Sequence, residues 1–221
     1  MKKKQLLAIL ALMLALGLPL PLDLFLDFTD ETREVVFDTL HVRSEAELFA
    51  ALKNESIKKI IFENDIVLLT SLEVSRDVTL DLNNYNLTTL RENVSAIDVK
   101  YGKLILTGKG SIVAYGLNSA AIRVKGAITA GNSNYAHVTV GRKLRLFAPN
   151  YYGIFVAPNY NSAYGITIDF HGTIVARDGI CIHRHIQGRG ENAPVIKVAD
   201  KAKITVDENE GIALHAGGFG R

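Results

Sequence analysis

Apolar and polar residues alternate in short runs along most of the chain after Lys59. The runs are rich in Ile, Val and Leu, and Gly, Asn, Asp or Pro separates one run from the next. Alternation with a period of two predicts half-buried strands, and the separating residues favour turns. The pattern therefore predicts an all-β domain, because no later run has the 3.6-residue period of a long helix.

One segment before these runs has a helical pattern. Ser44 and Glu47 have the spacing of a capping box, in which each side chain bonds the backbone N–H of the other residue. The apolar side chains that follow at helical spacing are Ala46, Leu48, Phe49 and Leu52. The sequence therefore predicts a helix that begins after Ser44 and ends near Asn54.

One apolar run recurs five times, and each copy begins with a small residue followed by isoleucine. The copies are residues 96–100, 121–125, 153–157, 179–183 and 211–215. Their isoleucines, at positions 97, 122, 154, 180 and 212, are 25, 32, 26 and 32 residues apart. A repeat of this length predicts a solenoid of stacked structural units.

Two further runs recur between these copies. The second run occurs at residues 103–106, 143–146, 166–170 and 203–206, and the third at residues 110–114 and 172–176. Each period then holds about three short strands and no helix. This content predicts a parallel β-helix, in which each coil adds one strand to each of three parallel sheets.

The stretch from Val78 to Thr88 reads VTLDLNNYNLT. It resembles a coil that is common in exported bacterial β-helix proteins of the pectate-lyase-like superfamily, and the helix after Ser44 resembles their N-terminal cap. The resemblance covers about residues 44–221 and implies a right-handed parallel β-helix solenoid with a short N-terminal capping helix. A helix over an open stack also shields unpaired strand edges. Function does not follow, because the motif is a structural coil.

Strand alternation predicts which residues of the first run point away from the core. Ile97, Val99 and their counterparts should face inward. One outward column should contain Asp98, Arg123, Phe155, Cys181 and Ala213, and the next should contain Lys100, Lys125, Ala157, His183 and His215. Because stacked coils are about 4.8 Å apart, we expect His183 and His215 to be neighbours.

This face is the most cationic surface that the sequence predicts. Its candidate ligand-binding residues are Lys100, Arg123, Lys125, His183 and His215. The face is either an ordinary solvated surface, a groove for an acidic polysaccharide, or a metal site formed by His183, His185 and His215. Imidazoles are suitable metal ligands, but no suitably spaced carboxylate completes that set. We therefore expect no metal and no other cofactor.

Residues 149–164 are rich in Tyr and Asn. The candidate ligand-binding residues here are Tyr151, Tyr152, Tyr160 and Tyr164. Tyr offers an apolar ring with a hydroxyl group, and Asn offers both a donor and an acceptor, which suits the binding of sugar rings. The same composition also suits an ordinary turn, so both interpretations stay open.

A catalytic site is harder to find in the sequence. Polysaccharide hydrolases use paired carboxylates, and lyases use carboxylates that hold Ca²⁺ together with a basic residue. The best acid–base candidates are Asp178, His183 and His185, with Arg177 and His171 nearby. Their spacing matches neither kind of enzyme and equally suits a surface turn, so we assign no catalytic residue.

The first 17 residues resemble a secretory signal peptide, with a basic start at 2–4, an apolar stretch at 6–16 and a small residue, Gly17, before the cleavage point. The apolar character continues to Leu22, so an uncleaved membrane anchor is the alternative, although two prolines oppose a continuous helix. Either form places the rest of the chain outside the cell. We interpret residues 18–43 as a linker or an irregular first strand.

Composition excludes several classes of function. The chain has 25 basic and 23 acidic residues, and without the three lysines of the leader the balance is 22 to 23, a net charge of −1. A nearly neutral chain is not a globally basic nucleic-acid binder. The single cysteine, Cys181, excludes a framework of intrachain disulfides.

These observations predict a secreted or cell-surface β-helix that binds glycans or mediates surface display or adhesion without catalysis. Its expected partner is a polysaccharide or a cell-surface glycan, with no nucleic acid, and a membrane only if the leader stays attached. The alternative is a lyase or glycoside hydrolase that acts on an acidic polysaccharide.

The C-terminal end of the predicted solenoid lacks a cap. Only residues 217–221, mostly glycine, follow the strand expected near 211–216. This tail is too short to complete the last coil or to cover it. We expect the β-helix at 44–221 to be truncated at this end, with further coils beyond Arg221.

Overall fold

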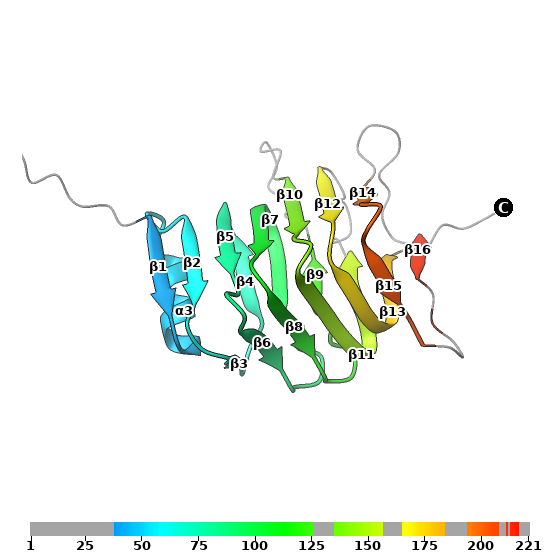
Figure 1. The fold of residues 1–221 in the computed structure, drawn as a ribbon, viewed down its shortest axis with the longest axis horizontal. Coiled ribbons are helices and arrows are strands. Elements are labelled where there is room, and N and C mark those ends of the chain that lie inside the picture. The colour runs from blue at the N-terminus through cyan, green and yellow to red at the C-terminus, as the bar shows by residue number, and fades with distance from the viewer. Residues whose placement is uncertain are drawn as a thin grey trace, which may run out of the picture. The chain divides into compact units, whose positions relative to one another are not determined.

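The computed structural model describes residues 38–125, 135–156, 165–183, 194–207, 211 and 213–216. The predicted signal peptide at 1–17 and the tail at 217–221 lie outside these residues. The described residues form one helix and sixteen strands, and the strands stack side by side from β1 to β16 (Figure 1). We treat them as three parallel sheets, which we call the first, second and third sheet.

The first sheet contains β1 (Thr39–Val42), β2 (Lys59–Phe62), β5 (Val78–Asp81), the second half of β7 (Ile97–Thr107), β10 (Ala136–Val140), β12 (Ile166–Phe170) and β14 (Val195–Val198). The second contains β3 (Ile66–Leu68), β6 (Asn86–Thr89), β8 (Gly110–Ala114), the first halves of β11 (Leu144–Val156) and β13 (Thr173–Ile182), and β15 (Lys203–Thr205). The third contains β4 (Leu72–Ser75), the first half of β7, β9 (Ile122–Val124), the second halves of β11 and β13, and β16 (Leu214–Ala216).

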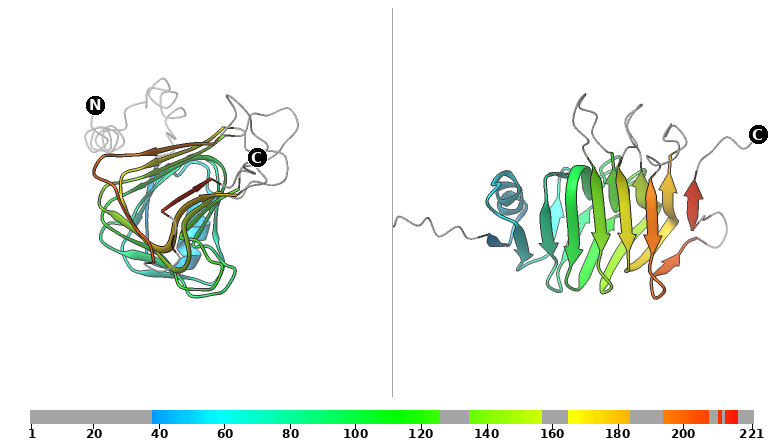
Figure 2. Two further views of the ribbon diagram at one scale, coloured as in Figure 1. Left: turned by 90° about the vertical axis from the view of Figure 1, so that its right-hand side faces the viewer. Right: turned by 90° about the horizontal axis from the view of Figure 1, so that it is seen from above.

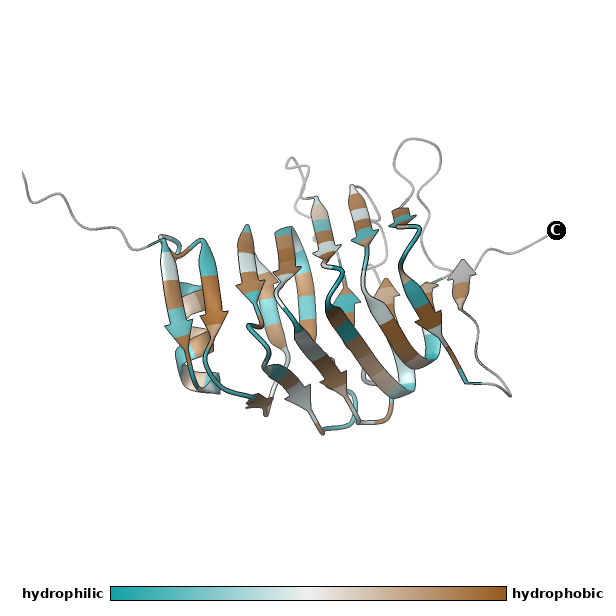
Figure 3. Ribbon diagram, in the orientation of Figure 1, coloured by the Kyte–Doolittle hydropathy of each residue, from teal (hydrophilic) through white to brown (hydrophobic). Residues whose placement is uncertain are grey.

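The chain visits the three sheets in turn, once per coil, and the view along the stack shows the strands surrounding a common interior (Figure 2). Every pairing between the described strands is parallel. The fold is therefore the predicted parallel β-helix. Alternation of apolar and polar residues is visible along the strands (Figure 3).

Like residues stack in register along the core. One ladder in the second sheet consists of Ile66, Leu87, Ile112, Leu146, Ile174 and Ile204. One ladder in the third sheet consists of Leu72, Ile97, Ile122, Ile154, Ile180 and Leu214. The first five members of each ladder are at most 2% exposed. Full burial of such a side chain stabilises the fold by about 1.5–3 kcal/mol, so these ladders hold the coils together.

The observed register confirms four copies of the first recurring run and corrects the fifth. Leu214, not Ile212, pairs with Ile180 in the third sheet. Both 211–212 and 213–214 are a small residue followed by an apolar one. Because a shift of two residues preserves the facing of every side chain, alternation alone could not distinguish the two registers.

The predicted second run groups together strands that belong to two different sheets. Segments 143–146 and 203–206 belong to the second sheet, where β11 pairs with β8 and β15 pairs with β13. Their places in the first sheet are taken by β10 and β14. Short β-branched strands resemble one another, so only the hydrogen-bonded pairing assigns them to a sheet.

Helix α3 (Glu45–Lys53) lies at the β1 end of the stack, as the capping prediction requires (Figure 1). Its N-cap is Ser44, whose hydroxyl accepts from the Glu47 N–H at 3.3 Å, and its C-cap is Asn54. The Glu47 carboxylate accepts from the Arg43 N–H at 2.7 Å instead of from Ser44. The capping box therefore closes one residue earlier than predicted.

The buried side of α3 differs slightly from the predicted stripe. Leu48 and Ala51 are buried, whereas Ala46 is exposed. With nine residues, α3 is far shorter than a membrane-spanning helix, and no other helix occurs in the described part of the chain.

Arg76, directly after β4, fixes the C-terminal end of α3. Its guanidinium donates to the carbonyl oxygens of Ala51 at 3.1 Å, Leu52 at 2.9 Å and Ile57 at 2.5 Å. The last carbonyls of a helix have no partner within the helix, and Arg76 supplies one for Leu52. It adds a second donor for Ala51, whose carbonyl also accepts from the Asn54 N–H at 3.3 Å. The helix end is thereby tied to the edge of the third sheet.

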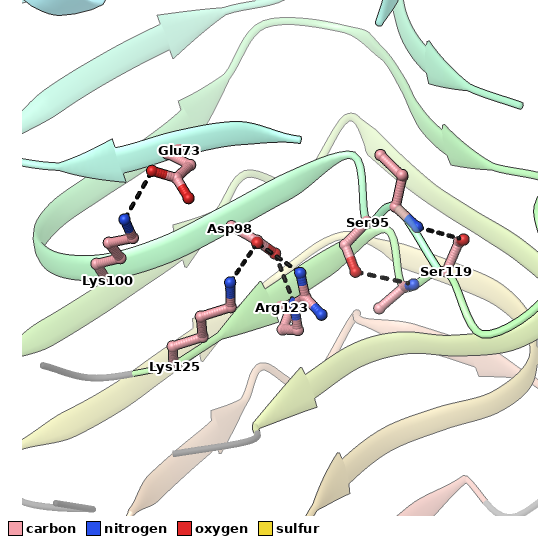
Figure 4. A network of polar contacts seen from close by, with 9 residues as sticks. Glu73, Ser95, Asp98, Lys100, Ser119, Arg123 and Lys125 are labelled. Carbon is pink, nitrogen blue, oxygen red and sulfur yellow. Dashed lines mark hydrogen bonds and ion pairs between the residues drawn. The ribbon is translucent and has the colours of Figure 1, made fainter. Parts of the chain in front are cut away.

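The turns that lead from the second sheet into the third also stack. Asn93 and Asn118 both adopt left-handed backbone conformations, with φ of 59° and 55°, which Asn tolerates better than most residues. The Asn118 amide donates to the Asn93 side-chain oxygen at 3.2 Å. The Ser119 and Ser95 hydroxyls accept from backbone N–H groups of the neighbouring coil at 3.1 and 3.2 Å (Figure 4). These bonds position the strands that carry the candidate site.

Candidate functional site

The outward side of the third sheet, which we call the outer face, brings together the cationic and aromatic groups that the sequence singled out. One row of this face runs Glu73, Asp98, Arg123, Phe155, Cys181 and His215 by backbone register. The predicted row was correct from Asp98 to Cys181. Its last position is His215 rather than Ala213, because the final strand is shifted by two residues.

This shift also corrects the predicted pair of histidines. The backbone of His215 pairs with Cys181, so His215 does not occupy the position beside His183. The side chain of His215 lies outside the described residues, as do His185, Tyr160 and Tyr164. Of the proposed metal ligands, only the side chain of His183 is described. In the described part of the chain, no group of three His, Cys, Asp or Glu side chains could hold a metal ion.

The N-terminal part of the outer face is a network of ion pairs, which we call the charged half (Figure 4). Asp98 is 2% exposed, yet it binds two cations. Arg123 donates from Nε to Oδ1 at 2.7 Å and from Nη2 to Oδ2 at 2.6 Å, and Lys125 Nζ lies 2.7 Å from Oδ2. Hydrogen bonding to Asp98 raises the pKa of Arg123, more than burial lowers it.

Lys100 is paired separately. Its ammonium group lies 2.7 Å from a carboxylate oxygen of Glu73 on β4. Of the three Lys and Arg side chains predicted for this face, two are balanced by Glu73 and Asp98, so the face is much less cationic than expected. The surplus of one positive charge lies where Arg123 and Lys125 share a single carboxylate.

A groove of about 740 Å³ lies between the C-terminal part of α3 and the charged half. Phe49 and Leu52 of α3 line one side, and Tyr101 of β7 with Arg123 and Lys125 line the other. This volume is within the range of small-molecule sites in proteins. The groove therefore offers apolar and aromatic surface beside the one surplus charge.

Tyr101 was missed by the sequence reasoning. Simple alternation from Val99 would turn its side chain inward, but the register between β4 and β7 shifts so that Ser75 pairs with Tyr101. Such an irregularity re-aims a side chain, and Tyr101 is 38% exposed and lines the groove. No one-dimensional signal identifies a shift that depends on the neighbouring coil.

The C-terminal part of the outer face is a cluster of rings, which we call the aromatic half. Tyr152 and Phe155 of β11 are stacked, with centroids 5.1 Å apart and planes 12° from parallel. Tyr151 and Phe155 are in edge contact with centroids 5.5 Å apart, as are Phe155 and His183 at 5.9 Å. The predicted Tyr151 and Tyr152 therefore belong to a packed cluster that also contains Phe155 and His183.

Cys181 is buried in this cluster, at 3% exposure. Burial raises the pKa of its thiol, although a hydrogen bond with Tyr152 acts in the opposite direction. Burial, together with the nearby thiol, raises the pKa of Tyr152 to about 12. Both groups are therefore protonated at neutral pH.

The described residues near the acid–base candidates show where Asp178, Arg177 and His171 lie. Asp178 is 8% exposed and accepts a hydrogen bond from Arg177 at 3.0 Å, and the Arg177 guanidinium lies 5.7 Å from the Tyr151 ring centroid. His171 follows β12 in the first sheet, where it pairs with Asp169 at 3.0 Å, so it does not join Asp178.

The comparison with protein families gives one match. Residues 39–180 match the family described as "Putative pectate lyase-like adhesive domain". The matched segment runs from β1 into β13 and therefore includes the charged half and Phe155 of the aromatic half. Comparisons with curated proteins and with solved structures gave no match.

The family match covers more than half of the chain and agrees with the coil-by-coil structure. It also agrees with the resemblance of the coil at Val78 to Thr88 to pectate-lyase-like β-helices. The chain therefore belongs to the family of pectate lyase-like adhesive domains.

Proposed function

We propose that this protein is an exported adhesion module that binds carbohydrate, without cleaving it, on the outer face of the third sheet. The observation that carries the proposal is the placement of the aromatic half beside the groove on one face. Arg123 of the charged half pairs directly with Phe155 of the aromatic half in the sheet. Aromatic rings with adjacent polar groups suit the apolar faces and hydroxyl groups of sugars.

The carboxylates of this face support binding rather than hydrolysis. Both oxygens of Asp98 are engaged by Arg123 and Lys125. Glu73 pairs with Lys100, and Asp178 holds Arg177. A glycosidase needs two carboxyl groups placed on either side of the scissile bond. Asp98 and Asp178 instead position cationic side chains, which is a binding role.

A stacked β-helix also suits adhesion mechanically. The core ladders give a rigid support, and the outer face presents its side chains from consecutive strands β4, β7, β9, β11 and β13. A ligand bound along this face would contact several coils at once. Sites built on rigid strands are more precise than sites built on loops.

A glycan array combined with an activity assay tests the proposal. We expect binding to a subset of glycans, and no release of reducing ends or unsaturated uronates from the bound glycans. Phe155→Ala should abolish most of the binding. Phe147→Ala, which removes a half-buried ring from the outward side of the second sheet, is the matched control and should retain it.

The outcomes separate the alternatives. Binding without turnover supports the adhesion module. Turnover of a bound polysaccharide would establish the enzymatic alternative instead. A protein that binds no glycan, or that binds equally well after Phe155→Ala, would contradict the proposed site.

A further inference from the structure

We infer that the outer face selects a glycan whose end carries one carboxylated sugar, followed by neutral sugars. The carboxylate would lie against Arg123 and Lys125 in the groove, and the neutral rings would lie over the aromatic half. This inference rests on the proposed carbohydrate-binding function and specifies the ligand class. It differs from an acidic polysaccharide with a carboxylate on every sugar.

The charge balance of the groove supports a single acidic group. Among the described residues, its cationic lining is Lys53, Arg76, Arg123 and Lys125, and its acidic lining is Glu55, Glu73 and Asp98. Glu73 of this lining pairs with Lys100, which lies outside it, so Glu73 does not offset the cations of the groove. Arg123 and Lys125 share the single carboxylate of Asp98, so one positive charge stays unbalanced at this pair. Arg76 donates instead to carbonyl oxygens at and just beyond the end of α3.

The two cations are held ready for an anion. Arg123 and Lys125 both bind the buried carboxylate of Asp98, and each side chain keeps 26% of its surface exposed. Asp98 therefore fixes the positions of both side chains, and their remaining N–H donors can reach a ligand in the groove. A guanidinium and an ammonium group together can bind one carboxylate through charge-assisted hydrogen bonds.

The order of groups along the face gives the ligand a direction. Phe49 and Leu52 of α3 line the groove on the side of the first coil. On the opposite side, Phe155 pairs with Arg123 one strand away, which is about 4.8 Å. A chain end in the groove would therefore continue over Phe155 and Tyr151, away from α3.

The same order disfavours a uniformly acidic chain. Among the described residues, its second carboxylate would meet the rings of Tyr151, Tyr152 and Phe155 rather than a second pair of cations that share one carboxylate. Arg177, whose guanidinium lies 5.7 Å from the Tyr151 ring centroid, already donates to Asp178. A carboxylate placed there would lose water without gaining an equivalent partner.

The test compares matched neutral and capped probes by calorimetry or ligand-observed NMR. The pairs are lactose with sialyllactose, and xylotriose with xylotriose that carries one glucuronate; tetragalacturonate is the uniformly acidic probe. In at least one pair, we expect the capped probe to bind about tenfold more tightly than its neutral partner, and more tightly than tetragalacturonate. Raising the salt concentration should reduce this preference, because exposed charges are screened.

Lys125→Met should remove the preference for the capped probe and leave binding of its neutral partner unchanged. Arg123 keeps its two bonds to Asp98 in this variant, so the fold should persist, which circular dichroism can verify. Lys125→Arg should retain the preference. Lys143→Met, on the exposed turn between β10 and β11, removes the same charge elsewhere and should change nothing.

Two results would overturn the inference alone: neutral and capped probes that bind equally, or tetragalacturonate that binds as tightly as the best capped probe. A preference that survives Lys125→Met would also overturn it. If no probe binds and the glycan array is also blank, both the inference and the proposed function fail.

Discussion

The charged and aromatic halves of the outer face follow the same alternation of side chains but are held together by different forces. In the charged half, the buried carboxylate of Asp98 fixes two cations. In the aromatic half, the Phe155 ring contacts the rings of Tyr152 and His183, and Phe155 pairs in the sheet with the buried Cys181. Asp98 and Cys181 both point outward, yet they are 2% and 3% exposed. A side chain that points outward from its strand is therefore not necessarily exposed, because side chains of neighbouring coils cover one another.

The largest expected effect comes from removing the centre of the charged half. Asp98→Ala should lower the free energy of unfolding by about 2–3 kcal/mol, because it leaves Arg123 and Lys125 without their carboxylate. This expected loss is smaller than the loss for breaking a fully buried ion pair, because both cations are partly hydrated. Urea denaturation measures it, and a loss smaller than about 0.5 kcal/mol would show that the network contributes little.

Phe155→Ala should have a smaller effect on stability, about 1–2 kcal/mol, because the ring loses its stacking with Tyr152 and its contacts with Tyr151 and His183. Salt distinguishes the halves. The cost of Asp98→Ala should fall as salt is added, whereas the cost of Phe155→Ala should not. If the stability loss of both variants depended equally on salt, the two halves would not differ in the forces that stabilise them.

The titration of Tyr152 probes the aromatic half alone. Its pKa is raised from 10.0 to about 12 in the folded protein. Between these values the unfolded chain holds fewer protons than the folded one, so stability should fall as pH rises from about 10 to about 12. Tyr152→Phe should flatten that slope, as measured by denaturation across this range. A variant with an unchanged slope would mean that another group causes the loss.

The smallest effect is expected at Lys100, at the edge of the charged half. Its pair with Glu73 is exposed, with side-chain exposures of 41% and 52%, so Lys100→Ala should cost less than about 0.5 kcal/mol. Glycan binding should also be unchanged, because Lys100 does not line the groove. A loss of binding comparable to that of Lys125→Met would support binding by the whole cationic face that the sequence predicts.

Local patterns predicted a large part of this molecule. The capping residues of α3 were readable because a cap involves neighbours in sequence, Ser44 and Glu47. The facing of Asp98, Arg123 and Phe155 was readable because alternation is a property of a single strand. The small residue before each isoleucine was readable as a repeat, but at Gly179 its cause lies between coils, since a Cβ atom there would overlap the carbonyl oxygen of Ala213 in the next coil.

The predictions from sequence were wrong where a partner or a register depended on a neighbouring coil. Glu73 was not recognised as the partner of Lys100, because its coil begins with Leu72 instead of the repeated isoleucine. Tyr101 reached the groove through a register shift. His215 moved away from His183 because two registers of equal parity compete in the last strand.

The sequence by itself determined that this chain forms stacked parallel strands with an apolar interior and one capping helix, because periodicity and capping act over a few residues. Only the tertiary structure decided which side chains meet across coils, and hence where charge is neutralised and where one positive charge remains. Asp98 and Arg123 are 25 residues apart in sequence, and their contact depends on backbone pairing between β7 and β9. Short-range patterns fix the direction of a side chain, whereas long-range register fixes its partner.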